Sequence, residues 1–243
     1  MADGRPLTTG ERVRGYAVHL YTASGIVLAA LAAAEIMSAR PDPRLVFVLF
    51  AAATLVDASD GFLARRWEVK RTAPDIDGRT IDDIVDYITF TFLPLLLVWR
   101  MGWVPDPALL WISPALIASL FGFANTSAKD EGGGFFLGFP SYWNVIAFYA
   151  GLLHPWVSAA MIVALAVLTV LPVRFIYPTL APHPWRVPLL VGAFAWLAFM
   201  LTTLPDYPDV EPWLLWLSLS YPLLYGALSW HLSRRDRRMR AGG

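Results

Sequence analysis

The chain has 243 residues, of which 57% are hydrophobic and 16% are charged, whereas about 25% are charged in ordinary soluble domains. This balance argues against a soluble protein. The sequence contains no cysteine, which excludes disulfides, thiolate nucleophiles and cysteine-based metal sites. The formal net charge of +0 gives no basic field of the kind that attracts nucleic acid, so we expect no nucleic-acid partner.

Successive apolar segments predict an all-α integral membrane protein with about eight transmembrane helices, since about 20 apolar residues cross a bilayer as a helix. In chain order the segments are residues 16–38, 45–65, 80–99, 107–125, 140–153, 156–173, 187–204 and 212–232. Residues 140–173 could instead form one long helix kinked at Pro155, because proline removes an interior hydrogen bond. The segments define a transmembrane catalytic domain over residues 16–232, between an amino-terminal cytoplasmic or interfacial segment (1–15) and a basic cytoplasmic tail (233–243).

The positions of lysine and arginine favour eight spans over seven. With eight spans, 16 of these residues lie on the side that holds both termini, and only Arg40, Arg44 and Arg100 lie on the other. Cytoplasmic loops carry the excess of positive charge, so both termini are expected in the cytoplasm. No cleavage site follows the first apolar segment, and we expect no secretory signal peptide. The basic tail either contacts anionic headgroups or serves only as a topology signal.

Carboxylates gather at the cytoplasmic ends of the second and third apolar segments. They are Asp57, Asp60, Asp82, Asp83 and Asp86. An ionised group in a membrane segment costs at least ~2.5–3.5 kcal/mol, so such residues normally line a cavity and bind something. Clustered carboxylates indicate a cation, and their hard oxygen ligands suit Mg²⁺ or Mn²⁺.

Helical geometry separates these acids into those that share a face and one that does not. At about 100° per residue, Asp57 and Asp60 lie on one face of their helix, and Asp82 and Asp86 recur one turn apart on the next. Asp83 points away from that face. Gly61 and Ala64 share the face of the first pair, where they leave room for a ligand or for close helix packing, and Arg65 at its border can pair with phosphate. A cation carrier is the alternative, although the cluster lies at the interface and not at the bilayer midplane.

These residues form a recognisable motif. Residues 57–65 read DASDGFLAR and residues 78–86 read GRTIDDIVD, which resembles the D-x2-D-G-x2-A-R and G-x3-D-x3-D signature of the CDP-alcohol phosphatidyltransferases. The 12-residue spacer between them (66–77) is longer than in most of that family and is similar to that of its bacterial phosphatidylcholine synthase branch. Further stretches of likeness are residues 19–25, 82–87, 136–144 and 172–178.

The resemblance implies a six-helix catalytic core that opens to the cytoplasm, in the inner membrane of a bacterium. It implies transfer of the phosphatidyl group from CDP-diacylglycerol to choline with release of CMP, dependent on Mn²⁺ or Mg²⁺. The resemblance also suggests a homodimer. Carried over residue by residue, the metal ligands would be Asp57, Asp60, Asp82 and Asp86. Asp82 and Asp86 would be the catalytic residues, with Asp86 either completing a two-metal site or acting as the general base. The CDP-binding residues would be Asp57, Asp60, Gly61, Ala64, Arg65 and Gly78.

The motif does not identify the acceptor alcohol, so serine, inositol or glycerol phosphate remain alternatives to choline. Aromatic faces hold quaternary ammonium groups, and they also form the interfacial belts of membrane proteins. The candidate choline-binding residues are Tyr21, Tyr87, Tyr142, Trp143 and Tyr149. An anionic acceptor would require more cationic residues near the site, and their scarcity favours an uncharged or cationic acceptor.

Overall fold

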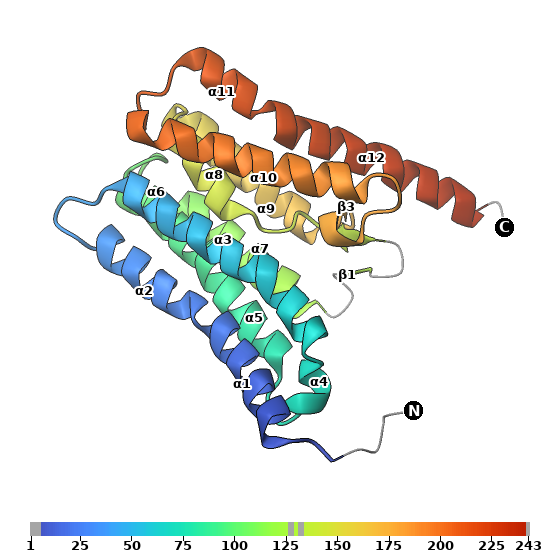
Figure 1. Cartoon of the computed structure of the whole chain (residues 1–243). Coiled ribbons are helices and arrows are strands. Elements are labelled where there is room, and N and C mark those ends of the chain that lie inside the picture. Colours follow the sequence, from blue (N-terminus) through green and yellow to red (C-terminus); the bar gives the residue numbers. More distant parts are fainter. Residues whose placement is uncertain (1–5, 126–128, 131–133, 242–243) are drawn as a thin grey trace. The chain divides into compact units, whose positions relative to one another are not determined.

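The structure, a computed structural model, describes residues 6–125, 129–130 and 134–241 (Figure 1). Residues 1–5 of the expected amino-terminal segment and residues 242–243 of the expected tail lie outside the described residues. The chain divides into two compact units, Met1–Leu93 and Pro94–Gly243.

The amino-terminal unit is helical. Its elements are α1 (Thr9–Ala23), α2 (Gly25–Ile36), α3 (Pro43–Arg66), α4 (Val69–Thr72), α5 (Gly78–Asp86) and the π-helical segment η1 (Tyr87–Phe92). Helix α1 begins well before the expected start at residue 16, because Thr8 and Glu11 form a capping box. The Thr8 side chain accepts a hydrogen bond from the Glu11 amide at 3.2 Å, and the Glu11 carboxylate accepts one from the Thr8 amide at 2.8 Å.

Helix α1 contacts α3, α4 and α5, and α2 contacts α3 and η1. The spacer between the two halves of the motif contains α4, which packs on α1. Val69 and Ala73 are buried with Val18 of α1, and a side chain at Gly15 of α1 would overlap the Thr72 hydroxyl. The spacer is therefore a packed element that connects the two acid-bearing helices.

In its described residues, the carboxy-terminal unit contains the remaining helices and three short strands. After α6 (Leu93–Arg100), its elements are α7 (Leu109–Ala124), β1 (Lys129–Asp130), β2 (Phe135–Leu137), α8 (Trp143–Ala150), α9 (Pro155–Val170), β3 (Arg174–Ile176), η2 (Pro178–Leu180), α10 (Arg186–Thr203), η3 (Leu204–Asp206), α11 (Pro212–Ser218) and α12 (Ser220–Ala241). Helices α8 and α9 are separate. His154 caps α9 in an extended conformation and Pro155 begins it, so residues 140–173 form two helices and not one kinked helix.

A small antiparallel sheet corrects the expectation of an all-α fold. The strand order is β1-β2-β3, and Phe135 lies opposite Ile176. Helix α12 stabilises the sheet edge: the Tyr225 hydroxyl donates to the Ile176 carbonyl at 2.7 Å, and the Ile176 amide donates to the Ser229 hydroxyl at 3.1 Å. These strands have only two or three residues each, too short to leave a strand periodicity in the sequence.

The basic segment after residue 232 is helical where it is described, because α12 continues to Ala241. The charged residues of this segment do not break a helix, since arginine has a high helix propensity. Asp236 of this segment forms a close ion pair with Arg174 of β3, and the Arg174 guanidinium lies 4.4 Å from the centre of the Phe135 ring. The end of α12 is thus attached to the sheet.

Three helical stretches within the described ranges are long and apolar enough to cross a membrane. They are Thr9–Ile36, Pro43–Arg66 and Arg186–Asp206, and two shorter apolar helices span Leu109–Ala124 and Pro155–Val170. Many large apolar side chains on these helices are exposed, such as Leu55, Leu120 and Phe194. A helical chain with this apolar surface has the properties of a membrane protein.

Candidate active site

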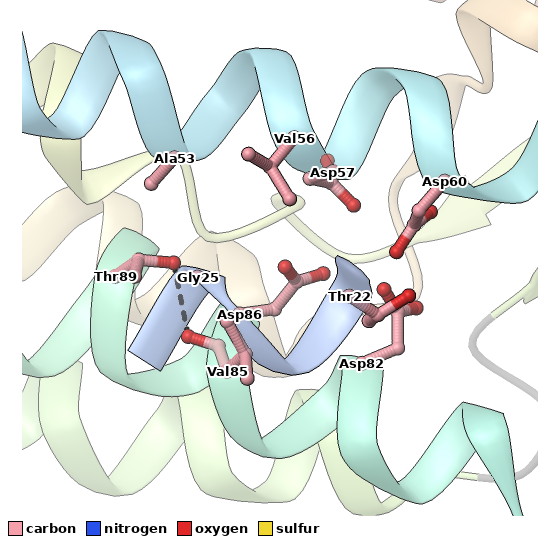
Figure 2. Close-up of a pocket in the computed structure, with 10 residues that line it drawn as sticks. All are labelled: Thr22, Gly25, Ala53, Val56, Asp57, Asp60, Asp82, Val85, Asp86 and Thr89. Atoms are coloured by element: carbon pink, nitrogen blue, oxygen red, sulfur yellow. Dashed lines mark hydrogen bonds between the residues drawn. The ribbon is translucent and has the colours of Figure 1, made fainter. Parts of the chain in front are cut away.

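The expected acidic helices face each other across a pocket in the amino-terminal unit. Figure 2 shows the side chains of α3 and α5 pointing toward one another, with α1 and the start of α2 beside them. The empty space of the pocket is about 220 Å³, a volume that includes open solvent. The lining residues are Thr22, Gly25, Ala53, Val56, Asp57, Asp60, Asp82, Val85, Asp86 and Thr89.

The pocket brings together the four carboxylates that share the predicted faces. Oxygens of Asp57, Asp82 and Asp86 all lie within 4.8 Å of one another, and these three side chains are half-buried. Asp60 also lines the pocket and is 8% exposed. Three convergent carboxylates at this spacing fit a hard divalent cation, whose ligand oxygens lie about 2.0–2.6 Å from the ion.

Asp83 lies outside the cluster, in agreement with the helical geometry. It is absent from the pocket lining, and its carboxylate pairs with the Arg79 guanidinium on the preceding turn of α5 at 3.6 Å. Two adjacent aspartates on one helix therefore have different surroundings, and only Asp82 faces the cavity.

The small residues of the motif lie close to the pocket without lining it. A Cβ at Gly61 would lie 3.3 Å from Nη1 of Arg65, so these two residues share a face of α3. Ala64 packs against the cluster that joins α1 and α4. At the start of α5, a Cβ at Gly78 would lie 2.7 Å from Cε1 of His19, which explains why α5 needs glycine where it meets α1.

Sequence reasoning did not assign Thr22, Gly25 and Thr89 to the pocket. Gly25 allows α2 to approach α5, since a Cβ there would lie 2.7 Å from a methyl carbon of Val85. The Thr89 hydroxyl donates to the Val85 carbonyl at 2.9 Å, within the π-helical segment that follows Asp86. Such segments are frequent at functional sites. Thr22 and Gly25 lie in residues 19–25, one of the stretches that resemble the family. That likeness is the sequence feature that could have placed them near the site.

The candidate choline-binding residues are divided between the two units. Tyr21 and Tyr87 belong to the unit that holds the carboxylates, and the Tyr21 hydroxyl lies 2.7 Å from the Ser59 hydroxyl of α3. Tyr142, Trp143 and Tyr149 belong to the carboxy-terminal unit.

Two of these aromatic residues are buried and hydrogen-bonded within their own unit. The Trp143 indole nitrogen donates to the Ser119 hydroxyl at 2.7 Å, and the Tyr149 hydroxyl donates to the Ser218 hydroxyl at 3.0 Å. Each side chain is less than 5% exposed. Both therefore have a packing role.

A mostly helical chain with apolar spans and a carboxylate pocket defines a helical membrane protein with a candidate cation-dependent active site. No family model matches the chain. It is 38% identical over 201 residues to the phosphatidylcholine synthase of Pseudomonas aeruginosa, covering 79% of this chain and 80% of that protein.

Further relatives carry the same name. The chain is 34% identical over 211 residues to the phosphatidylcholine synthase of Mesorhizobium japonicum (83% of this chain, 76% of that protein). It is 30% identical over 237 residues to that of Legionella pneumophila (93% and 91%). The chain belongs to the phosphatidylcholine synthase family, which confirms the resemblance found in its motif.

Proposed function

We propose that this protein is a CDP-diacylglycerol–choline O-phosphatidyltransferase, which converts CDP-diacylglycerol and choline into phosphatidylcholine and CMP. The observation that carries the proposal is the convergence of Asp57, Asp82 and Asp86 in a pocket formed by the two halves of the motif. The named relatives support this substrate pair.

Asp57, Asp82 and Asp86, with Asp60 beside them, would hold Mn²⁺ or Mg²⁺. A bound divalent cation stabilises negative charge that develops on the diphosphate. Gly61, Ala64 and Arg65 would hold the cytidine and the diphosphate, with the exposed Arg65 guanidinium on a phosphate, and Gly78 lets α5 approach α1 closely.

The reaction is a direct displacement. The choline oxygen forms a bond to the phosphorus that carries diacylglycerol, and the bond from that phosphorus to the CMP oxygen breaks. Asp86 accepts the choline hydroxyl proton, which a positioned carboxylate can do with about 10²–10⁴-fold benefit. CMP leaves with the electron pair of the broken bond.

The membrane arrangement follows from the apolar segments and their charges. We infer eight spans, the first six forming the catalytic core, with both termini and the active site on the cytoplasmic side of a bacterial inner membrane. The domain over residues 16–232 carries the catalysis, and two such chains form a homodimer. Tyr21 and Tyr87 are the aromatic candidates for choline, because they belong to the unit that holds the carboxylates.

Adjacent aspartates of α5 provide a matched test. Purified protein with CDP-diacylglycerol and Mn²⁺ should move radiolabelled choline into chloroform-soluble lipid and release CMP, and EDTA should abolish both. Asp82→Asn should lower CMP release at least about 100-fold, because it removes a pocket carboxylate. Asp83→Asn should leave it within about twofold, because surface substitutions have small effects.

Mn²⁺ should raise the unfolding temperature of the Asp83→Asn protein and not that of the Asp82→Asn protein, because a ligand stabilises the folded state that binds it. Equal activities of the two variants would remove the metal assignment. CMP release with serine, inositol or glycerol phosphate but not choline would keep the enzyme class and replace the acceptor. If no alcohol released CMP, a cation carrier would be the better explanation.

A further inference from the structure

His19 of α1 is a buried histidine that the proposed mechanism does not use. Its side chain is 6% exposed, and its Nε2 atom is buried and forms no hydrogen bond in the described part of the chain. A buried nitrogen without a partner carries a desolvation cost that a partner would offset. Such a group in a native structure requires an explanation, and a ligand that supplies the partner is one.

The imidazole lies one helical turn from the carboxylate pocket. A Cβ at Gly78 would lie 2.7 Å from Cε1 and 3.0 Å from Nδ1 of His19, so the ring occupies the space that glycine leaves at the start of α5. Three residues further along α1, Thr22 lines the pocket, and four residues further along α5, Asp82 does. His19 is therefore at the α1–α5 contact that forms one end of the site.

The chemistry of the two substrates decides which of them His19 contacts. This step rests on the proposed function. The quaternary ammonium of choline has neither an N–H group nor a lone pair, and the one hydrogen-bonding group of choline, its hydroxyl, is assigned to Asp86 in the proposed reaction. A cytidine diphosphate carries several donors and acceptors. We propose that His19 is a nucleotide-binding residue, whose Nε2 forms a hydrogen bond with the CDP headgroup.

Access to the nitrogen requires a small movement of α5. No side chain of α5 is fully buried, although Ile81 and Val85 are half-buried, whereas α1 buries several residues fully. A segment with little buried apolar surface moves at low cost in free energy. The start of α5 can therefore separate from α1 when the nucleotide enters, and the new hydrogen bond offsets the loss of contact.

Two substitutions at this position separate ligand binding from packing. His19→Leu removes the nitrogen and retains apolar bulk, and His19→Gln returns a donor and an acceptor near the position of Nε2. His19→Leu should raise the KM for CDP-diacylglycerol and the Kd for CMP, measured by calorimetry on detergent-solubilised protein, by about tenfold each. The KM for choline should stay within about twofold, and His19→Gln should recover most of the CMP affinity.

Stability should change in the opposite direction to affinity. Replacing an unsatisfied buried polar group by an apolar one is neutral or stabilising, so the unfolding temperature of nucleotide-free His19→Leu protein should equal or exceed that of the wild type. Wild-type CMP affinity in His19→Leu would overturn the proposal. So would a joint loss of affinity and stability that His19→Gln does not repair.

The CMP measurement also distinguishes this proposal from the proposed function. If the wild type binds CMP but does not use choline, the acceptor is wrong and the His19 comparison still decides the nucleotide contact. If the wild type does not bind CMP, both proposals are overturned.

Discussion

The two units use buried polar groups in different ways. In the carboxy-terminal unit, Ser119 of α7 receives hydrogen bonds from the Ser141 hydroxyl at 3.0 Å and from the Trp143 indole at 2.7 Å. The Tyr149 hydroxyl donates to Ser218, which joins α8 to α11. These buried groups form hydrogen bonds with one another, and the bonds connect helices of the unit.

The amino-terminal unit instead gathers groups of like charge. Asp57, Asp82 and Asp86 place their oxygens within 4.8 Å of one another, and the repulsion between like charges at this spacing is what a bound cation would offset. His19 adds a buried nitrogen without a hydrogen bond. The polar groups at and beside the pocket thus differ from the mutually hydrogen-bonded groups that join α7, α8 and α11.

The largest effect on stability is expected at the ion pair of the carboxy-terminal unit. Asp236→Ala should lower the free energy of unfolding by about 3 kcal/mol, because it leaves the Arg174 guanidinium buried without its carboxylate. The Arg174 side chain is only 9% exposed. Thermal unfolding in detergent measures the loss, and the KM for CDP-diacylglycerol should stay unchanged, since the pair belongs to the framework.

An exposed ion pair provides the control. Asp42 and Arg44 lie 3.0 Å apart with side chains 41% and 50% exposed, and water screens their attraction. Arg44→Ala should therefore leave the unfolding temperature nearly unchanged. If Asp236→Ala had as small an effect, or raised the KM for CDP-diacylglycerol, the assignment of this pair to the framework would be wrong.

The positions of the helices and the four pocket carboxylates could be predicted from the sequence, because apolar runs and a 3.6-residue period are local signals. Helix α3 begins at Pro43, within two residues of the expected start, and Asp83 faces away from the pocket as its phase requires. Local patterns did not reveal contacts between distant residues, such as Arg174 with Asp236 or Gly78 with His19. These depend on how helices pack in three dimensions.

The next largest effect is expected where the spacer packs on α1. Gly15→Ala should lower the free energy of unfolding by about 1–3 kcal/mol, because overpacking forces side chains and backbone to shift. The new Cβ would overlap the Thr72 hydroxyl, and Thr72→Ala removes that oxygen. The double variant should be more stable than the sum of the two single effects, which a double-mutant cycle measures.

This substitution also sharpens the comparison between the units. Helix α4 connects the acid-bearing helices, so Gly15→Ala should raise the KM for CDP-diacylglycerol, unlike Asp236→Ala. Thr72→Ser, which keeps the hydroxyl, should not relieve the clash. Full relief by Thr72→Ser would show that the overlap lies elsewhere.

The smallest effect on the unfolding temperature is expected at Asp77, a carboxylate of the amino-terminal unit that has a structural role. It caps α5: the Thr80 hydroxyl donates to it at 2.8 Å and the Arg79 amide at 3.0 Å, and these bonds hold the pKa of Asp77 below its ordinary 3.8. A carboxyl whose pKa is lowered by folding stabilises the folded protein at pH values above its unfolded-state pKa. This stabilisation is lost as the pH falls through the folded-state pKa. Asp77→Asn keeps the cap without the charge.

The unfolding temperature of the Asp77→Asn protein should therefore lie slightly below that of the wild type near pH 7, and the difference should shrink below about pH 4. Thr80→Val should reduce the difference too, because it removes the largest cause of the shift, whereas parallel curves for wild type and Asp77→Asn would contradict the assignment.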